Sequence, residues 1–375
     1  NGARDVVLGA PGSATAFGFT GAAIAAGDPN EGTEVSSGEW QLQDGRALAA
    51  MEIASGDLDD DGVDDLVFGS TGGDETAGGY YPSVSVVYGP VAQGSIYADV
   101  RLEGEGIYSI FGAALATGPV TLGGADALLV GAPQEAEWCG AAYLLLGPLA
   151  DAGAVSNLVY EGGLGAGGVK FVDPCDTSES VYSRGQLGNA VALLPLTAGD
   201  AWPIVAAPAA DHRRTDQGAV FIFGDELVAG IPVDLDAGSG RGFAGIASGE
   251  YFGTALAAGD VDGSGYADLI VGAMYADGEA DDNGAVYVFL DVERRETPWD
   301  GAENADVTLL GNDRNEIDNT TNLGASVAIL LIMVYWITLA ALDEQLSDSV
   351  ERETQVLVDL YRGRGLDSVV RAIQL

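Results

Sequence analysis

Short apolar runs alternate with stretches of glycine, aspartate and proline along most of the chain, a pattern that predicts an all-β protein. One apolar run, typified by Asp-Leu-Ile-Val-Gly-Ala, recurs at 5–11, 127–133, 203–208 and 268–273. A second run, typified by Gly-Ala-Val-Tyr-Val-Phe, follows a short loop later at 83–88, 140–145, 218–223 and 284–289. Recurrence of the same phrases predicts repeated β-rich units.

Two further phrases complete the unit. An opener, in which an aromatic residue or Leu precedes Gly, stands at 111–112, 187–188, 252–253 and 323–324. A closing phrase, Asp-Val-x-Leu-x-Gly, stands at 99–104 and 306–311. Successive openers lie roughly 70 residues apart, and each unit contains four short β-rich segments. A four-stranded sheet repeated radially is a β-propeller blade, so we predict a β-propeller; a single broad β-sandwich does not explain the period.

Two of the units contain an acidic turn immediately before a predicted strand. Its positions 1, 3, 5, 7 and 9 are filled in the first turn by Asp57, Asp59, Asp61, Val63 and Asp65, and in the second by Asp260, Asp262, Ser264, Tyr266 and Asp268. Side-chain oxygens at four positions, with a backbone carbonyl at position 7, are ligands that suit Ca²⁺. An EF-hand needs Glu at position 12, where the first turn has Phe68. We therefore predict calcium loops that lead into strands; a solvated turn is the alternative, disfavoured because the pattern occurs twice.

Together these phrases resemble the FG-GAP repeat, which builds the β-propeller head of integrin α subunits and occurs in bacterial surface proteins. The resemblance runs from about residue 4 to residue 328. It implies Ca²⁺ on loops between blade strands, and extracellular recognition or adhesion through a protein or glycan ligand. It predicts a propeller domain over 1–328, with units at 4–45 (partial), 46–105, 106–163, 183–238, 250–311 and 321–328 (partial). The two partial units either close a five-bladed ring or mark a fragment of a longer propeller.

Composition limits the partners and the compartment. The chain has 57 acidic residues against 15 Lys and Arg, for a formal net charge of −42. Such a charge repels nucleic acid and anionic lipid and suits an extracellular or cell-surface protein, bacterial by the resemblance. The two cysteines, Cys139 and Cys175, form a disulfide in an oxidising compartment or remain two unpaired thiols.

The C-terminal region departs from the repeat pattern. No charged residue occurs from Leu323 to Leu342, a length that allows a helix to cross a membrane. We predict a membrane helix with its main part at 329–342 and an amphipathic helical tail at 343–375; a buried strand followed by a core helix is the alternative.

This region resembles the first membrane helix and the start of the sensor region of a bacterial sensor histidine kinase. The resemblance rests on Ala-Leu-Asp-Glu-Gln-Leu at 341–346 and Leu-Tyr-Arg-Gly-Arg-Gly-Leu-Asp at 360–367. It places the segment after the helix outside the cytoplasm, where the propeller is also expected, although one crossing separates the two. The sequence favours a fusion of two coding sequences at Ala328; a natural membrane-anchored propeller is the rival.

Three functions are compatible with these features. The favoured one is a non-catalytic, calcium-binding propeller for surface recognition or adhesion. A propeller hydrolase is disfavoured because the chain has one His and no Gly-x-Ser-x-Gly motif. An extracytoplasmic sensory region joined to a signalling helix is the third, although neither a phosphoacceptor His nor an ATP-binding glycine box is visible.

Overall fold

The computed structural model describes residues 6–10, 15–19, 39–42, 50–71, 82–90, 94–106, 108–120, 125–149, 167–172, 185–211, 214–224, 227, 233–234, 240–277, 284–295 and 299–310. All of them belong to one compact unit, Asn1–Ser326. Their regular structure is almost entirely β, as the sequence predicts. Among these residues no helix combines the length and apolar character that a membrane span requires. The predicted membrane helix and helical tail lie outside the described residues.

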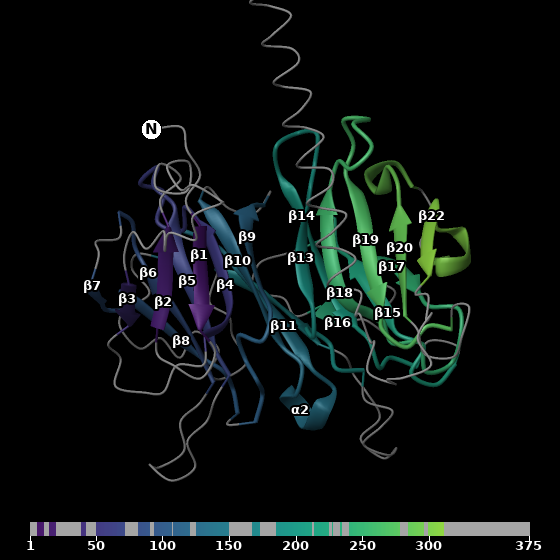
Figure 1. Ribbon diagram of the computed structural model, residues 1–375, viewed down its shortest axis with the longest axis horizontal. Coiled ribbons are helices and arrows are strands. Elements are labelled where there is room, and N and C mark those ends of the chain that lie inside the picture. The colour runs from purple at the N-terminus through teal and green to yellow at the C-terminus, as the bar shows by residue number, and fades with distance from the viewer. Residues whose placement is uncertain are drawn as a thin grey trace, which may run out of the picture. The chain divides into compact units, whose positions relative to one another are not determined.

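The strands of the described residues form five sheets, each built mainly from strands that are consecutive in sequence (Figure 1). The first contains β1 (Val6–Ala10), β2 (Thr15–Phe19), β3 (Glu39–Leu42) and β7 (Gly94–Ile96). The second contains β4 (Ala50–Gly56), β5 (Asp65–Ser70), β6 (Ser83–Val87) and β8 (Val100–Glu103). The third contains β9 (Leu115–Pro119), β10 (Asp126–Ala132), β11 (Ala141–Leu145), β12 (Gly168–Val172) and β16 (Val233–Asp234).

The remaining two sheets complete the set. The fourth contains β13 (Val191–Pro195), β14 (Ala201–Ala207), β15 (Ala219–Ile222), β17 (Arg241–Ala244) and β21 (Trp299–Gly301). The fifth contains β18 (Phe252–Gly259), β19 (Asp268–Ala273), β20 (Ala285–Phe289) and β22 (Val307–Leu310). Neighbouring strands are antiparallel throughout, except that β7, β16 and β21 each add a parallel edge strand contributed from further along the chain.

Four sheets follow the order expected of the repeated unit, but two of their fourth strands begin later than the sequence units end. The unit predicted at 106–163 is completed by β12, and the unit predicted at 183–238 is completed by β17. These strands read Gly-Val-Lys-Phe-Val and Arg-Gly-Phe-Ala, so they lack the closing phrase that marks β8 and β22. Pairing with the buried third strand determines where they lie, because the local sequence carries no closing signal.

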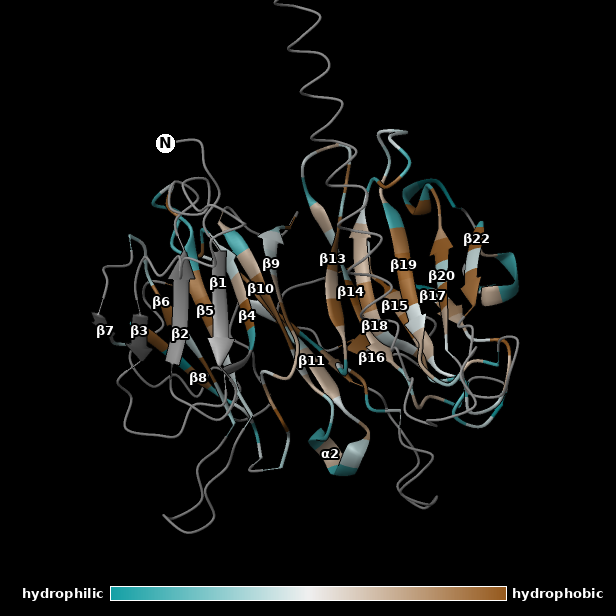
Figure 2. Cartoon of the chain, viewed as in Figure 1, coloured by the Kyte–Doolittle hydropathy of each residue, from teal (hydrophilic) through white to brown (hydrophobic). Residues whose placement is uncertain are grey.

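Hydrophobic clusters lie between consecutive sheets. The first joins β5, β6 and β8 to β10 and β11; the second joins β9–β12 to β13–β15; the third joins β14, β15 and β17 to β18–β20. In Figure 2, the inner strands β5, β19 and β20 are coloured largely as hydrophobic. The first strands of successive sheets also touch, β4 with β9, β9 with β13, and β13 with β18. The second to fifth sheets are therefore each stabilised by contacts with their neighbours in sequence.

Glycine allows the sheets to approach closely. A Cβ atom on Gly69 would lie 2.2 Å from the carbonyl oxygen of Gly112, and one on Gly131 would lie 2.0 Å from that of Gly188. Atoms this close overlap, so a side chain at either position would push the sheets apart. This contact gives a physical reason for Gly in the recurrent Val-Gly-Ala strand end and in the opener.

Two buried tyrosine–glutamate pairs anchor the third strands. The Tyr143 hydroxyl donates to Glu135, which also pairs with the Lys170 ammonium at 2.7 Å, and the Tyr287 hydroxyl donates to Glu250. Burial raises the pKa of both tyrosines, and the adjacent carboxylates raise it further. Glu135 begins α2 (Glu135–Trp138), a short left-handed turn beyond β10. Among the described residues, the other two short helices are η4 (Val292–Arg294) and η5 (Ala302–Asn304).

Candidate metal centres

The two acidic turns occupy equivalent places in their sheets. The first connects β4 to β5 and the second connects β18 to β19. Each hairpin closes at a glycine–aspartate pair, Gly56 with Asp65 and Gly259 with Asp268. The aspartate of each pair is position 9 of the turn, so the hairpin register places the turn directly against the strands.

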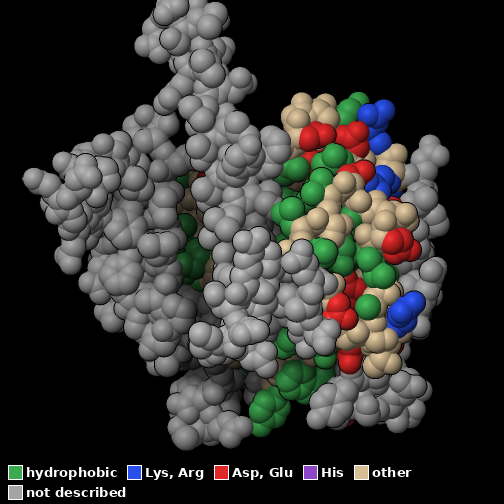
Figure 3. Space-filling view, turned by 45° about the vertical axis from the view of Figure 1, so that its right-hand side comes forward, with side chains coloured by type: hydrophobic (Ala, Val, Ile, Leu, Met, Phe, Trp, Pro, Cys, Tyr) green, Lys and Arg blue, Asp and Glu red, His purple; other side chains and the backbone are tan. Residues whose placement is uncertain are grey.

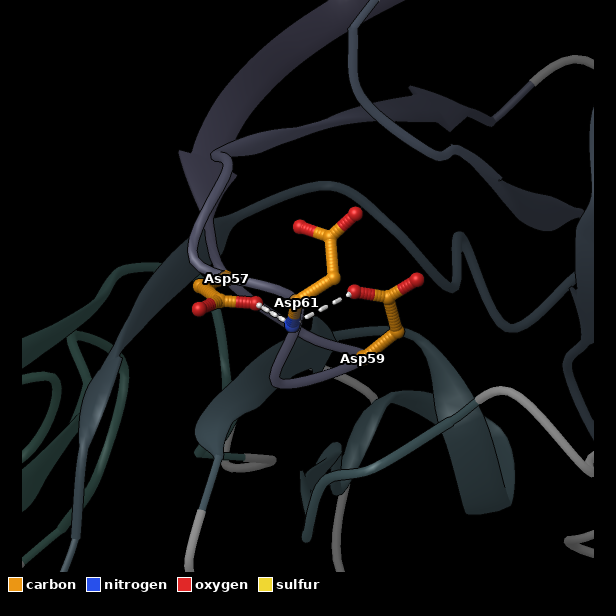
Figure 4. A group of neighbouring side chains, drawn as sticks. All are labelled: Asp57, Asp59 and Asp61. Atoms are coloured by element: carbon orange, nitrogen blue, oxygen red, sulfur yellow. Dashed lines mark hydrogen bonds between the residues drawn. The ribbon is translucent and has the colours of Figure 1, made fainter.

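In the first turn the backbone holds the carboxylates in place. The N–H of Asp61 donates to Asp57 Oδ1 at 3.0 Å and to Asp59 Oδ1 at 3.2 Å, as Figure 4 shows. The N–H of Gly62 donates to Asp57 Oδ2, and that of Val63 donates to Asp61 Oδ1. Carboxylate oxygens of Asp57, Asp59 and Asp61 lie within 4.8 Å of one another.

The second turn repeats these bonds position by position. The N–H of Ser264 donates to Asp260 Oδ1 at 3.0 Å and to Asp262 Oδ1 at 2.9 Å. The N–H of Gly265 donates to Asp260 Oδ2, and that of Tyr266 donates to the Ser264 hydroxyl oxygen. Because the sequences differ at several positions, the shared bonds show that the turn itself is a common structure.

Glycine at position 6 is required by the backbone. Gly62 and Gly265 both have φ of +85°, in the left-handed region that side chains disfavour. Position 4 is also left-handed, with Gly263 in the second turn and Asp60 in the first. Aspartate tolerates this conformation better than most residues, which explains why Asp60 is accommodated there.

Position 9 has a second structural role that its spacing does not reveal. Asp65 is fully buried; its Oδ2 accepts the N–H of Leu58 at 2.8 Å and its Oδ1 accepts the N–H of Gly89 at 2.9 Å. Asp268 repeats this in the second turn, accepting the N–H of Val261 at 2.7 Å and that of Asp291 at 2.8 Å. Each position-9 carboxylate therefore fastens its turn to the end of the third strand.

The structure groups the predicted ligands unequally. In the second turn Asp260, Asp262 and Asp268 share a 4.8 Å neighbourhood, whereas in the first turn the corresponding group omits Asp65. Burial raises the pKa of Asp268, and the charges of Asp262 and Asp260 raise it further. The pKa of Asp65 is raised in the same way, by burial first. Like charges held this close together gain stability from a cation.

One further acidic residue at the first turn was missed by sequence reasoning. Asp126 begins β10 of the next sheet, and its Oδ2 accepts the N–H of Asp57 at 3.2 Å. The N–H of Asp126 in turn donates to the carbonyl of Asp57 at 2.9 Å. Burial raises the pKa of Asp126, followed by the charges of Asp57 and Asp64. Its repeat lacks the aspartate pattern, so only the contact between sheets identifies it.

The donor set fits a hard divalent cation. The side-chain donors are carboxylate oxygens and one hydroxyl, without nitrogen or sulfur, and they lie on tightly hydrogen-bonded turns. Oxygen-only donors favour Ca²⁺, Mg²⁺ or Mn²⁺ over zinc or copper. Asp57, Asp59 and Asp61 would hold one ion, with Asp65 as the fourth carboxylate of that turn, and Asp260, Asp262, Ser264 and Asp268 would hold the other.

Only one of the two cysteines in the predicted disulfide lies among the described residues. Cys139 is buried beside β11 and is not a free thiol. Cys175 lies outside the described residues, so its pairing with Cys139 stays a prediction.

Comparison with known families identifies one repeat. Residues 252–289, from β18 through the second acidic turn to the end of β20, match the FG-GAP repeat model. This segment is an FG-GAP repeat. It agrees with the resemblance proposed from the opener at Phe252 and from the phrase that ends at Phe289. No curated protein is significantly similar in sequence to the chain. Nothing in the comparisons supports the histidine-kinase-like reading of the C-terminal segment.

Proposed function

We propose that the chain is a calcium-binding β-propeller protein that recognises a partner outside the cell without catalysing a reaction. The observation that supports calcium binding is that the two acidic turns share backbone hydrogen bonds at equivalent positions. One of these turns lies inside an FG-GAP repeat. The sheets of four consecutive strands, packed side by side through glycine contacts, support the propeller part.

Charge and surface chemistry support a recognition role. A formal net charge of −42 disfavours nucleic acid and anionic membranes as partners. On the described part of the face drawn in Figure 3, acidic and basic side chains lie among hydrophobic ones instead of forming one acidic field. A protein or glycan on a cell surface or matrix is the proposed ligand, and an extracellular or cell-surface location follows from that role.

Calorimetric titration of the full chain with Ca²⁺ tests the proposal. We expect two sites in the wild type and one in Asp59→Asn, because position 3 of the first turn loses its charged ligand. Asp60→Asn is the matched control: it removes the neighbouring charge from a position outside the ligand pattern and should leave two sites. Asp59→Asn combined with Asp262→Asn should leave none.

Thermal unfolding provides a second readout. Free Ca²⁺ at 100 times the dissociation constant stabilises a site by about 2.7 kcal/mol. In a unit as long as Asn1–Ser326, each kcal/mol raises the melting temperature by about 1–2 °C. Calcium should therefore raise the melting temperature by several degrees, and EGTA should reverse the change. The calcium proposal fails if the wild type shows neither a heat of binding nor a calcium-dependent shift.

A further inference from the structure

The two turns differ in charge at position 5. The first turn has Asp61 there and the second has Ser264, so the second is one carboxylate short of the first. The affinity of an oxygen-ligand loop for Ca²⁺ depends strongly on the number of charged ligands. On the pattern alone, the second turn is expected to be the weaker site.

A carboxylate from outside the turn lies beside position 5 of the second turn. Asp291, in the loop after β20, accepts the Ser264 hydroxyl proton on its Oδ1 at 2.7 Å. Its backbone N–H is one of the two donors to Asp268, so its position is fixed against the turn. The other oxygen of Asp291 pairs with the Arg294 guanidinium at 3.4 Å. Asp291 lies two residues beyond the matched FG-GAP repeat, so the repeat pattern does not include it.

The first turn has no carboxylate at the place equivalent to Asp291, because there is no room for a side chain there. Gly89 takes the place of Asp291, donating its N–H to Asp65 as Asp291 does to Asp268. A Cβ atom on Gly89 would lie 2.6 Å from Val63 Cγ1 and 2.7 Å from the carbonyl oxygen of Asp64. Only glycine fits there. The first turn instead has a carboxylate within the turn at position 5, on Asp61.

We infer that Asp291 supplies the fourth negative charge of the second calcium site, in place of the aspartate that Ser264 replaces. The Ser264 hydroxyl oxygen has two lone pairs; one accepts the Tyr266 N–H, and the other is left for a cation when the proton is donated to Asp291. Ser264 thus serves as a neutral ligand and Asp291 as the charge behind it. This inference rests on the proposed calcium binding and adds a residue to it.

The test is calcium calorimetry on the full chain in an Asp59→Asn background, in which only the second turn binds. Asp291→Asn keeps the shape of the side chain and removes its charge. We expect its calcium dissociation constant to rise about ten-fold, the order expected for one carboxylate near a divalent ion in a solvated site. Adding Ser264→Asp should restore most of the affinity, because the charge returns to position 5.

Two further variants distinguish an effect of the Asp291 charge from a general effect of changing charge in this loop. Glu293→Gln removes a charge two residues from Asp291. The Glu293 carboxylate accepts a hydrogen bond from Thr197 and none from the turn, so this variant should change the calcium affinity less than two-fold. Arg294→Gln removes the cation paired with Asp291 and should tighten binding. It also keeps the inference testable if Asp291→Asn does not fold.

The outcomes are distinct. An unchanged affinity in Asp291→Asn overturns the inference and leaves the proposed calcium binding intact. Loss of affinity that Ser264→Asp fails to restore means that Asp291 acts by shaping the loop, and this also overturns it. Absence of calcium binding in the wild-type chain refutes the proposed function itself.

Discussion

The position-9 aspartates should stabilise the fold even without metal, and Asp268→Asn is the sharpest perturbation of this role. Asp268 is fully buried, and its two oxygens accept backbone N–H groups from Val261 and Asp291. An asparagine side chain offers one acceptor oxygen and an NH₂ group. One of the two N–H groups therefore loses its acceptor and faces a donor instead.

The expected cost follows from these two bonds. A hydrogen bond to a charged group contributes about 1.5–3 kcal/mol, and a buried donor left without an acceptor costs about 1–3 kcal/mol. Relief of the repulsion from Asp260 and Asp262, which raises the pKa of Asp268, offsets part of this loss. We therefore expect Asp268→Asn to lower the free energy of unfolding by about 2–3 kcal/mol in EGTA.

Urea unfolding of the full chain in EGTA measures this loss. Asp65→Asn should have a similar effect, because Asp65 makes the same two bonds in another sheet. Asp262→Asn is the control: its carboxylate is exposed and accepts one bond, so its effect should stay below about 0.5 kcal/mol. Hydrogen exchange should show faster exchange at Val261 and Asp291 in Asp268→Asn alone. Equal destabilisation by Asp262→Asn and Asp268→Asn would refute the reasoning.

Two further predictions concern the packing of the sheets. Gly131→Ala should lower stability by about 1–3 kcal/mol in urea unfolding, because its Cβ would overlap the carbonyl oxygen of Gly188, whereas Gly106→Ala, which has open space, should be neutral. Equal effects of the two would exclude the proposed contact. Burial raises the pKa of Tyr143 and Tyr287, so above pH 10 only the unfolded state loses their protons; stability should fall there by about 1.4 kcal/mol per pH unit for each tyrosine. Tyrosine absorbance that titrates fully near pH 10, with the native circular dichroism spectrum retained, would contradict this.

The repeated phrases allow much of the fold to be predicted from sequence. The Gly-Ala-Val-Tyr-Val-Phe phrase falls on β20, and the run Asp-Leu-Ile-Val-Gly-Ala falls on β19. These strands are recognisable because burial on both faces demands a continuous apolar run. The strands β12 and β17 are harder to place, since Lys170 and Arg241 interrupt their apolar character and no closing phrase follows.

Sequence predicts only those candidate site residues that lie within each acidic turn. Spacing along the chain identifies Asp57, Asp59 and Asp61, because their backbone positions alone bring the carboxylates together. It does not identify Asp291, which is 27 residues from Ser264 in sequence. The pairing of β19 with β20 brings the two residues into contact. Nor does spacing identify Asp126, which comes from another sheet. Contacts of this kind depend on strand register, which spacing within a turn does not encode.

The hydrogen bonds of position 9 would couple the proposed metal binding to three strands of a sheet. Each acidic turn joins the first and second strands, and its buried aspartate accepts the N–H of the second residue after the third strand, Gly89 in one sheet and Asp291 in the other. A cation that orders the turn therefore also restrains three of the four strands. The sheets built on β9–β12 and β13–β17 lack such a turn among their described residues and depend on other contacts, of which the ion pair between Glu135 and Lys170 is one. Calcium would thus stabilise some repeats selectively, because, within the described part of the chain, only they contain the turn through which it would act.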